Sequence, residues 1–329
     1  MADRRRSGEF DLIARLFAPL AAGEPGAFGL TDDAAVLAVP PGERVVITTD
    51  TMVAGGHFLP DDPPDLIARK LMRVNLSDLA AMGATPIGYT LNTALPETID
   101  DTWLEKFADG LKADQERFRF TLVGGDTVAI PGPLTLTLTA LGRVAEGCEI
   151  RRSGAQNGDT LYVSGTIGDA ALGLMILQKR LHGPTDEDDR ALVARYRLPE
   201  PRVDLGPRLI GLAHAALDVS DGLIADLGHI CETSDKGAVV EATRVPLSPA
   251  ARHAVAAGLV PIEALLTGGD DYELLFAAPA AADAALREIA RLTDVSITAV
   301  GRITAGGGIR VFDRDGGEIR LDRAGYTHF

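Results

Sequence analysis

Six short groups of residues in this sequence place aspartates next to glycine, serine or threonine, each beside an apolar run. The groups cover residues 31–33, 48–51, 75–78, 124–127, 218–222 and 268–271. If the fold brings these carboxylates together they repel one another, and a divalent cation relieves that repulsion. Such cations usually carry phosphate, and the chain has neither a G-x-x-x-x-G-K-[ST] loop nor a kinase-type lysine with a His-Arg-Asp set. The sequence therefore predicts a metal-dependent site for a phosphorylated ligand.

Asp78 carries the clearest indication that these aspartates are functional. It belongs to a strong helical pattern over residues 63–82 and lies within its apolar stripe, since each helical residue advances by about 100°. That stripe consists of Ile67, Leu71, Val74 and Met82. A carboxylate on a buried face costs several kcal/mol unless a partner compensates for it. We interpret Asp78 as a metal ligand. The alternatives are an inward aspartate satisfied by an arginine or by backbone N–H groups, and a helix that ends before it.

Asp50 follows a β-branched run, at the C-terminal tip of a strand predicted over residues 44–49. Thr48 and Thr49 add hydroxyl and carbonyl oxygens, which suit the mixed oxygen ligands of a hard cation. The same residues also fit a turn at the end of a strand. The pair of aspartates that ends at Asp33 precedes a small apolar run, and it fits a helix cap as well as a metal site.

Glycines accompany two further candidates. Gly125 is the second of two glycines before Asp126. Glycine lets the backbone approach a phosphate closely, while the aspartate can contact the cation. A plain turn is the alternative for these residues. His57 also follows two glycines, so it is either a ligand contact on a glycine-rich loop or an ordinary surface histidine.

Asp218 and Asp221 lie where a predicted strand passes into a helix. Ser220 or Asp221 could serve only as the helix N-cap, a common role for these residue types. A cap would still leave the second acid unexplained. Asp270, in a Gly-Gly-Asp-Asp group, raises the same problem further along the chain. Each group has an ordinary structural explanation by itself, but six such groups together are hard to explain as caps.

Length and composition limit what the chain can be. At 329 residues it fits two domains of about 150 residues each. We predict an N-terminal domain over residues 1–148 and a C-terminal domain over residues 149–329. The net charge of −15 disfavours nucleic acid and anionic membranes as partners. No signal peptide and no apolar run of about 20 residues is found, so we expect a soluble cytoplasmic protein. Cys148 and Cys231 fit neither a metal site nor a disulfide framework.

The predicted elements make an α/β or α+β protein in two halves. In the first half we predict helices over residues 9–20, 63–82 and 101–118, with strands over 44–49, 122–123 and 134–141. In the second half we predict strands over 160–164 and 216–219, helices over 170–181 and 223–230, and a hairpin over 305–321. Residues 182–190 are rich in glycine, proline and acids, which indicates a solvated loop.

Longer motifs resemble the thiamine-monophosphate kinase family. They are Gly8-Glu9-Phe10, Asp32-Asp33-Ala34-Ala35, residues 48–58 with His57, residues 74–83 with Asp78, Gly124-Gly125-Asp126-Thr127, Asp218-Val219-Ser220-Asp221-Gly222-Leu223 and Gly269-Asp270-Asp271-Tyr272-Glu273-Leu274. The resemblance extends from Gly8 to the C-terminal residues, and the long blocks around His57 and Asp78 make it specific. The family belongs to the superfamily of aminoimidazole-ribonucleotide synthetase and selenophosphate synthetase.

The resemblance implies an N-terminal α/β domain that binds ATP and Mg²⁺ and dimerises through its sheet, with a barrel-like dimer interface. It also implies a C-terminal α+β domain. The implied reaction is the ATP-dependent phosphorylation of thiamine monophosphate to thiamine diphosphate, the last step of thiamine diphosphate biosynthesis, with several Mg²⁺ ions. The implied partners are ATP, thiamine monophosphate and a second copy of the chain.

Position by position, the resemblance implies three sets of site residues. The Mg²⁺ ligands, direct or through water, are Asp33, Thr48, Thr49, Asp50, Asp78, Asp126, Asp218 and Asp221. The ATP contacts are Gly125, Asp126, Arg152 and Ser220, and the substrate contacts are His57, Asp270 and Arg323. Two positions depart from the family. Asp270 replaces a glutamate that is common there, and Arg323 stands at the position of an aromatic substrate contact, which affects stacking on thiamine.

The acceptor in such a reaction is a phosphate oxygen that is already anionic at neutral pH, so no general base is expected. We therefore expect direct in-line transfer in a ternary complex, without a phosphoenzyme. One alternative is another ATP-dependent synthetase of the superfamily. Selenophosphate synthetases carry a reactive cysteine or selenocysteine near the N-terminus, and this chain has no cysteine before Cys148. The other alternative is a non-catalytic binding protein, which would not need an acid at every matched position.

Overall fold

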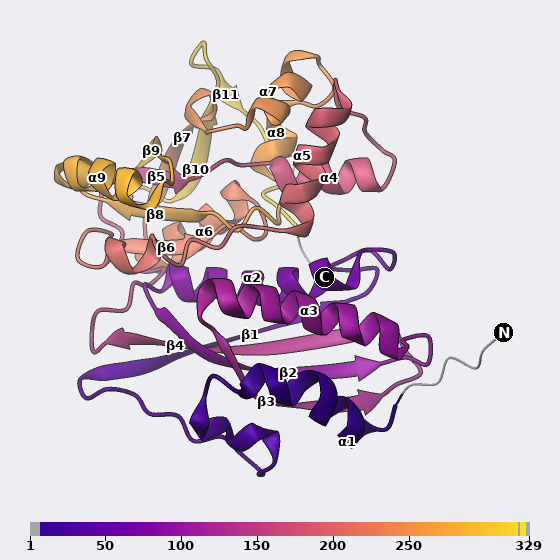
Figure 1. Cartoon of the computed structure of the whole chain (residues 1–329). Coiled ribbons are helices and arrows are strands. Elements are labelled where there is room, and N and C mark those ends of the chain that lie inside the picture. Colours follow the sequence, from indigo (N-terminus) through magenta and orange to yellow (C-terminus); the bar gives the residue numbers. More distant parts are fainter. Residues whose placement is uncertain (1–6, 322, 327–329) are drawn as a thin grey trace. The chain divides into compact units, whose positions relative to one another are not determined.

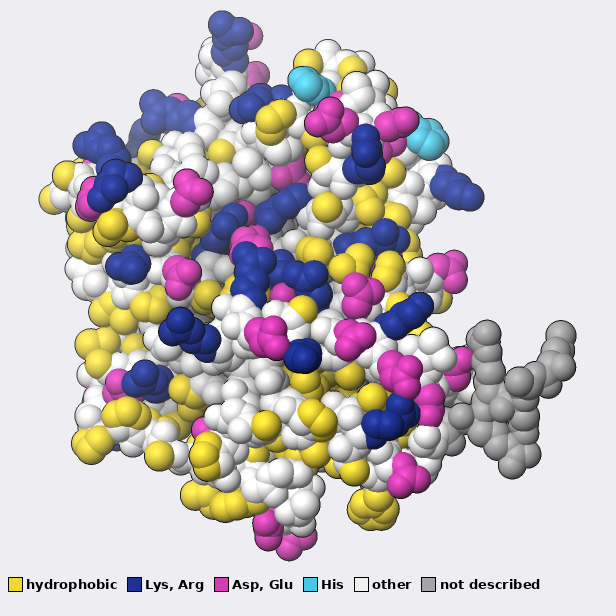
Figure 2. All heavy atoms as spheres, in the orientation of Figure 1, with side chains coloured by type: hydrophobic (Ala, Val, Ile, Leu, Met, Phe, Trp, Pro, Cys, Tyr) yellow, Lys and Arg dark blue, Asp and Glu magenta, His cyan; other side chains and the backbone are white. Residues whose placement is uncertain are grey.

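The computed structural model describes residues 7–321 and 323–326, and the chain forms two compact units (Figure 1). The first unit contains residues 1–79 and 84–147, and the second contains residues 80–83 and 148–329. Each unit has its own sheet with accompanying helices, so the fold is a mixed α/β fold of two domains. Among the described residues, no helix is both long and apolar enough to cross a membrane. On the face drawn in Figure 2, acidic side chains are interspersed with lysine and arginine.

The first unit is built on a four-stranded sheet in the order β1-β4-β2-β3. Strand β4 pairs antiparallel with both β1 and β2, and β2 pairs parallel with β3. The strands are β1 (Glu43–Val53), β2 (Thr85–Leu95), β3 (Thr121–Ala129) and β4 (Thr135–Ala145). The sheet is open, with β1 and β3 as its edges, and the described residues of this unit close no barrel. A barrel-like interface would therefore need a second chain.

Two long helices, α2 (Pro64–Ala81) and α3 (Asp101–Phe118), lie on one face of this sheet (Figure 1). Both were predicted from their apolar periodicity, and both are confirmed. Alternate residues of β4, such as Leu136 and Leu138, are fully buried. The two helices approach each other closely, because a Cβ atom on Gly110 of α3 would lie 2.3 Å from the carbonyl oxygen of Asp65 in α2. Only glycine permits that approach.

The N-terminal segment packs against β3 as a series of short helical turns. It consists of α1 (Glu9–Leu12), the π-helical turn η1 (Ile13–Phe17) and the 3₁₀ turns η2 (Ala18–Ala21) and η3 (Pro25–Leu30). Ala21 and Ala27 form a buried cluster with Val123 of β3. The helix predicted over residues 9–20 is thus helical throughout but not a regular α-helix. Pro19 has no N–H with which to continue the α-helical ladder.

The second unit contains a seven-stranded sheet in the order β11-β10-β7-β9-β5-β8-β6. Its strand pairs are antiparallel except for the pair of β7 and β10. The strands are β5 (Thr160–Ser164), β6 (Ala215–Asp218), β7 (Gly237–Glu241), β8 (Leu274–Ala278), β9 (Ile297–Thr304), β10 (Gly308–Phe312) and β11 (Glu318–Ile319). Strands β10 and β11 form the hairpin that was predicted over residues 305–321.

Three buried clusters hold the helices of the second unit. Leu227 of α6 and Leu217 of β6 belong to one buried cluster, and Leu286 of α9 and Phe276 of β8 belong to another. The third cluster joins α4, α5, α7 and α8. The helices are α4 (Asp169–Leu177), α5 (Asp186–Arg197), α6 (Leu223–Ser234), α7 (Pro249–Ala256), α8 (Ile262–Leu266) and α9 (Asp283–Thr293), with 3₁₀ turns η4 (Gly206–Leu209), η5 (Ala242–Arg244) and η6 (Ala280–Ala282).

Several predicted boundaries are wrong: helix α4 ends at Leu177 and not at 181, and α6 and β4 each extend four residues past the predicted end. Three further boundaries also differ. Strand β1 continues past Asp50 to Val53, because β4 pairs with it over that whole length, so Asp50 lies within the strand and not at its tip. Strand β3 likewise continues through the Gly-Gly-Asp motif, which is therefore not a loop. Helix α5 begins inside the predicted loop over 182–190. The Thr185 hydroxyl caps it there, and four acids in its first turn suit the positive end of the helix dipole.

Candidate active site

Asp50 of β1 and Asp78 of α2 form a like-charged pair in the first unit. Burial raises the pKa of Asp50 from 3.8 to about 7, with a further contribution from the charge of Asp78. Thr48 lies two residues before Asp50, on the same side of β1. Its hydroxyl donates a hydrogen bond to Oδ2 of Asp78 at 2.5 Å. The structure thus brings together three of the predicted ligands, around a repulsion that a cation would relieve.

The Thr49 side chain takes a different direction. Its hydroxyl donates to the carbonyl oxygen of Leu138 at 3.1 Å and accepts from the hydroxyl of Thr139 at 3.1 Å. Successive side chains of a strand point to opposite faces of the sheet. The side chains of Thr48 and Asp50 therefore share one face of β1, and the Thr49 hydroxyl belongs to the other.

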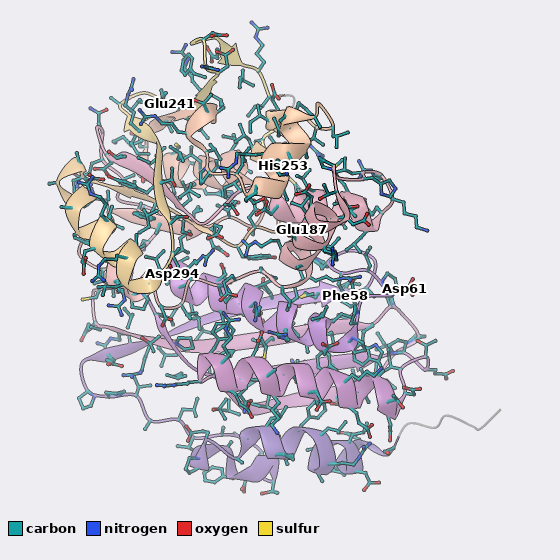
Figure 3. The ribbon with its side chains drawn as sticks, turned by 45° about the horizontal axis from the view of Figure 1, so that its top comes forward. Phe58, Asp61, Glu187, Glu241, His253 and Asp294 are labelled. Atoms are coloured by element: carbon teal, nitrogen blue, oxygen red, sulfur yellow. The ribbon has the colours of Figure 1, made fainter. Side chains whose placement is uncertain are left out.

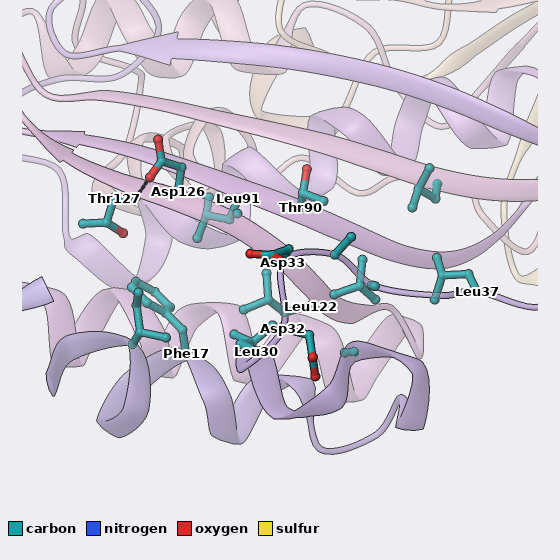
Figure 4. A pocket seen from close by; sticks show the side chains of 18 residues that line it. Phe17, Leu30, Asp32, Asp33, Leu37, Thr90, Leu91, Leu122, Asp126 and Thr127 are labelled. Atoms are coloured by element: carbon teal, nitrogen blue, oxygen red, sulfur yellow. Dashed lines mark hydrogen bonds between the residues drawn. The ribbon is translucent and has the colours of Figure 1, made fainter. Parts of the chain in front are cut away.

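A cavity of about 420 Å³ lies in the first unit, where the N-terminal segment passes β2 and β3 (Figure 4). Asp32, Asp33, Gly125 and Asp126 line it, together with apolar side chains that include Phe17, Leu30, Leu37 and Leu122. Oδ1 of Asp126 accepts a hydrogen bond from the N–H of Thr127 at 2.8 Å. Apolar walls with a few polar groups are typical of a ligand pocket. The structure therefore places Asp33 and Asp126, which are far apart in the sequence, at one cavity.

Gly125 has a packing reason that is independent of any ligand. Its φ of 155° belongs to the range that favours glycine. A Cβ atom at this position would lie 1.9 Å from the carbonyl oxygen of Leu91 in the neighbouring strand β2. The pairing of β2 with β3 therefore requires glycine here.

His57 lies on a tight turn after β1. The N–H of Val53 donates to Nδ1 of His57 at 3.1 Å, so the lone pair of Nδ1 is the acceptor and the ring proton of the neutral imidazole is on Nε2. The carbonyl oxygen of Val53 accepts from the N–H of His57 at 3.0 Å. Lys70 of α2, only 3% exposed, donates from Nζ to the carbonyl oxygen of His57 at 3.3 Å. The next residue, Phe58, is buried (Figure 3). Lys70 thus supports this turn from inside.

In the second unit, Asp218 ends β6, and Asp221 precedes helix α6. Asp218 is buried, whereas Ser220 and Asp221 are half-buried. The N–H groups of Ser220 and Asp221 both donate to Oδ2 of Asp226, at 3.0 Å each. The turn between β6 and α6 is thereby fixed to the first turn of the helix.

Asp226 was not predicted as a site residue. Burial raises its pKa to about 7, and the charge of Asp221 also raises it, while hydrogen bonds from backbone N–H groups oppose the shift. A signal was present in the sequence, because Asp226 lies beside Leu223, Leu227 and Ile230 on the buried stripe of α6. The argument that identified Asp78 applies equally to Asp226.

Asp270 is brought to the same turn from the loop before β8. Its N–H donates to the carbonyl oxygen of Ser220 at 2.8 Å, and its φ is 71°, a strained value for a residue with a side chain. The hydroxyl of Tyr272 donates to Oδ1 of Asp270 at 3.2 Å. Asp271, between them, is buried and accepts from the N–H of Gly168 at 2.7 Å; burial raises its pKa. The second unit thus gathers Asp218, Ser220, Asp221 and Asp270, and Tyr272 joins them unpredicted.

The two predicted arginines are both exposed. The residue before Arg152 accepts a hydrogen bond through its carbonyl oxygen from the N–H of Ala216 at 2.9 Å, which places Arg152 beside β6. Arg323 lies three residues before Tyr326, whose N–H donates to the carbonyl oxygen of Asp221 at 3.0 Å. An aromatic residue therefore stands beside the Asp221 turn although Arg323 itself is not aromatic. The sequence argument missed Tyr326.

In the described part of the chain, no three histidine, cysteine or acidic side chains gather closely enough to hold a metal by themselves. The residues nevertheless fit Mg²⁺. Burial, and after it the charge of Asp78, raises the pKa of Asp50, so the ionised carboxylate is held at a cost that a cation would reduce, and Thr48 adds a hydroxyl oxygen. Hard cations prefer such oxygens, and Mg²⁺ is commonly bound by one or two carboxylates together with water and substrate phosphates.

Comparison with known proteins accounts for this arrangement. Residues 31–144 match the model of the AIR synthase related protein N-terminal domain, and residues 156–314 match that of its C-terminal domain. The thiamine-monophosphate kinase of Escherichia coli O157:H7 is 45% identical over 98% of this chain and 98% of its own length. The chain belongs to the thiamine-monophosphate kinase family. Arg152 and Arg323 lie outside the two segments matched by the domain models, and all the other predicted site residues lie inside them.

Solved structures of the thiamine-monophosphate kinase family have the same fold. The enzyme from Stenotrophomonas maltophilia K279a has a TM-score of 0.81 and 41% identity, and the match covers 92% of this chain and 97% of that one. AaThiL complexed with AMPPCP and TMP has a TM-score of 0.75 and 30% identity, over 93% and 98% of the two chains. The sequence-based assignment to this family is confirmed.

Proposed function

We propose that this chain transfers the γ-phosphoryl group of ATP to thiamine monophosphate, which yields ADP and thiamine diphosphate. The observation that carries the proposal is similarity over almost the full length to thiamine-monophosphate kinases. The ligands of AaThiL, AMPPCP and TMP, correspond to the two substrates of this reaction.

The chemistry requires little covalent work from the protein. The acceptor oxygen of thiamine monophosphate is anionic at neutral pH, so no side chain needs to remove a proton. The acidic side chains would hold Mg²⁺, which would supply charge cancellation between the two phosphate-bearing substrates and help to align them for in-line transfer. The same side chains suit the positive charge of the thiazolium ring. We propose direct transfer between the two bound substrates.

Each unit supplies its own residues to this function. In the first unit we assign Mg²⁺ binding to Asp33, Thr48, Asp50, Asp78 and Asp126, and in the second unit to Asp218 and Asp221. Thr49 is left out of the side-chain ligands because its hydroxyl is bonded to the carbonyl of Leu138. Gly125, Asp126, Arg152 and Ser220 are assigned to the nucleotide, and His57, Asp270 and Arg323 to thiamine monophosphate. His57 would act as a donor from Nε2, since its Nδ1 already accepts from Val53.

We propose a homodimer that forms through the sheet of the first unit, in keeping with an N-terminal domain for ATP, Mg²⁺ and dimerisation over residues 1–148 and a second domain over 149–329. The support is an exposed apolar row on the edge strand β1. Val45 is 45% exposed and Ile47 is 65% exposed, and Thr49 and Thr51 continue the same face. An exposed apolar row on an edge strand favours association with another sheet.

The test is an incubation of the protein with ATP, Mg²⁺ and thiamine monophosphate, followed by chromatographic detection of thiamine diphosphate. The expected result is ADP and thiamine diphosphate in equal amounts. Ligand binding without product would favour a non-catalytic binding protein. ATP turnover that is independent of thiamine monophosphate would favour another synthetase. An Asp78→Asn variant serves as the matched inactive control.

A further inference from the structure

Three consecutive N–H groups converge on one carboxylate oxygen in the second unit. Those of Ser220, Asp221 and Gly222 donate to Oδ2 of Asp226 at 3.0, 3.0 and 3.1 Å. Asp226 is 3% exposed and lies in the first turn of α6. Successive backbone N–H groups that point at one spot form a site for an anion. Here the anion is a side chain of the protein itself.

The carbonyl groups of the same turn are bonded as well. The oxygen of Ser220 accepts from the N–H of Asp270 at 2.8 Å, and that of Asp221 accepts from the N–H of Tyr326 at 3.0 Å. Hydrogen bonds with Asp226, Asp270 and Tyr326 thus fix the main chain of the turn. Within the described residues, the Ser220 hydroxyl and the Asp221 carboxylate make no hydrogen bond. The backbone groups of the turn are therefore hydrogen-bonded within the protein, and these two side chains remain available to a ligand.

We propose that Asp226 is a positioning residue, which fixes the turn so that the Asp221 carboxylate and the Ser220 hydroxyl meet the metal–nucleotide complex in one geometry. It does not contact the ligand itself. The inference rests on the proposed function, which gives Asp221 and Ser220 their ligands. It adds that the nucleotide is held here by side chains, because Asp226 already occupies the N–H groups that could otherwise bind a phosphate.

The position of the contacts separates this role from plain helix capping. A cap satisfies N–H groups in the first turn of the helix, and α6 begins at Leu223. The Gly222 N–H belongs to the N-cap of α6, but the other two donors, Ser220 and Asp221, lie before the cap and carry the side chains proposed as ligands. Loss of Asp226 leaves those three N–H groups without their acceptor, so the turn relaxes to satisfy them elsewhere. This relaxation would move the side chains of Asp221 and Ser220 directly.

The experiment measures the affinity for Mn²⁺, used as a probe for Mg²⁺, by electron paramagnetic resonance in the presence of ADP. Asp226→Ala is expected to weaken Mn²⁺ binding by roughly 10- to 100-fold, as is usual when a residue behind a metal ligand is lost. Asp226→Asn should stay within about threefold of the wild type, because the amide oxygen can accept the same N–H groups. Activity and thermal melting are recorded for each variant.

Asp188→Ala is the matched control. Asp188 is also a buried carboxylate of the second unit, and its Oδ2 accepts from the hydroxyl of Thr185 at 2.8 Å, at the start of α5. Oδ1 of Asp188 also lies 3.2 Å from Nδ1 of His253 on α7; His253 is labelled in Figure 3. Neither partner is a proposed ligand. Asp188→Ala should lower the melting temperature without changing the Mn²⁺ affinity.

Each outcome decides the matter. A folded Asp226→Ala protein that melts earlier but binds Mn²⁺ normally would show a purely structural residue and overturn the proposal. If the alanine variant does not fold, Asp226→Glu decides instead: it retains the charge but displaces the oxygen, so unchanged Mn²⁺ affinity overturns the proposal. Asp221→Asn tests the underlying function separately. If that variant keeps normal Mn²⁺ affinity and turnover, the role assigned to Asp221 is wrong, whatever Asp226 does.

Discussion

Replacing Asp50 by asparagine should stabilise the first unit in the absence of metal while it abolishes activity. The folded protein raises the pKa of Asp50 from 3.8 to about 7. Between these two pH values the folded chain binds a proton that the unfolded chain has lost, so the free energy of unfolding falls as the pH rises. The loss is complete above pH 7. It is absent near pH 4 and below, where Asp50 is protonated in the unfolded state as well as in the folded state.

The size of the effect follows from that shift. A rise from 3.8 to about 7 corresponds to ~4 kcal/mol at about 1.4 kcal/mol per pH unit. Because Asp50 is half-buried and water screens part of its charge, we expect about half of this, ~2 kcal/mol, from Asp50→Asn at pH 8. At roughly 2–4 °C per kcal/mol, the transition of the first unit should move up by about 4–8 °C.

The assay is thermal unfolding at pH 8 with a chelator, followed by the fluorescence of Trp103. This is the single tryptophan of the chain, and it stacks on Phe107 within α3, so it reports on the first unit. Asp126→Asn is the control, because it removes an exposed carboxylate and should give no such gain. An Asp50→Asn protein that melts at or below the wild-type temperature would refute the reasoning. Addition of Mg²⁺ should stabilise the wild type more than the variant.

Asp78→Asn and Asp126→Asn should each lower turnover by orders of magnitude with an unchanged circular dichroism spectrum; near-normal ADP production by either would contradict the metal assignment. Lys70→Met should raise KM for thiamine monophosphate by about tenfold, because it removes a charged hydrogen bond from the His57 turn. The same change should add nothing when His57 is already alanine; an equal effect in both backgrounds would mean that Lys70 acts elsewhere. Ile47→Glu should convert a dimer into a monomer in light scattering, since an unpaired charge is not tolerated inside an interface. A dimer that persists would place the interface on another surface.

Helical periodicity was the most reliable guide from sequence to site. It located α2 and singled out Asp78, because the 3.6-residue repeat of apolar residues is a property of local sequence. Asp78 is only half-buried, less buried than its neighbours in α2, and its carboxylate accepts from Thr48 of β1. The same test would have found Asp226.

Features that depend on a partner strand or a distant segment could not be predicted in this way. Nothing in the local sequence shows that β1 continues to Val53, since its length is set by pairing with β4. Tyr326 reaches the Asp221 turn through a backbone hydrogen bond across 105 positions of the chain, and no periodicity announces such a contact. The direction of the Thr49 hydroxyl also follows only from the register of the strand.

Strand packing determines the residue at Gly125, but it does not determine the residue at Asp126. The backbone of β2 excludes any side chain at Gly125, whereas the exposed Asp126 carboxylate is not needed by the sheet. A substitution at Gly125 would thus abolish activity through misfolding and would say nothing about phosphate binding. In a relative that had lost the reaction, we would expect the glycine to persist and the aspartate to drift. If Asp126 holds Mg²⁺ as we propose, the glycine would mark shared ancestry and the aspartate would mark a working enzyme.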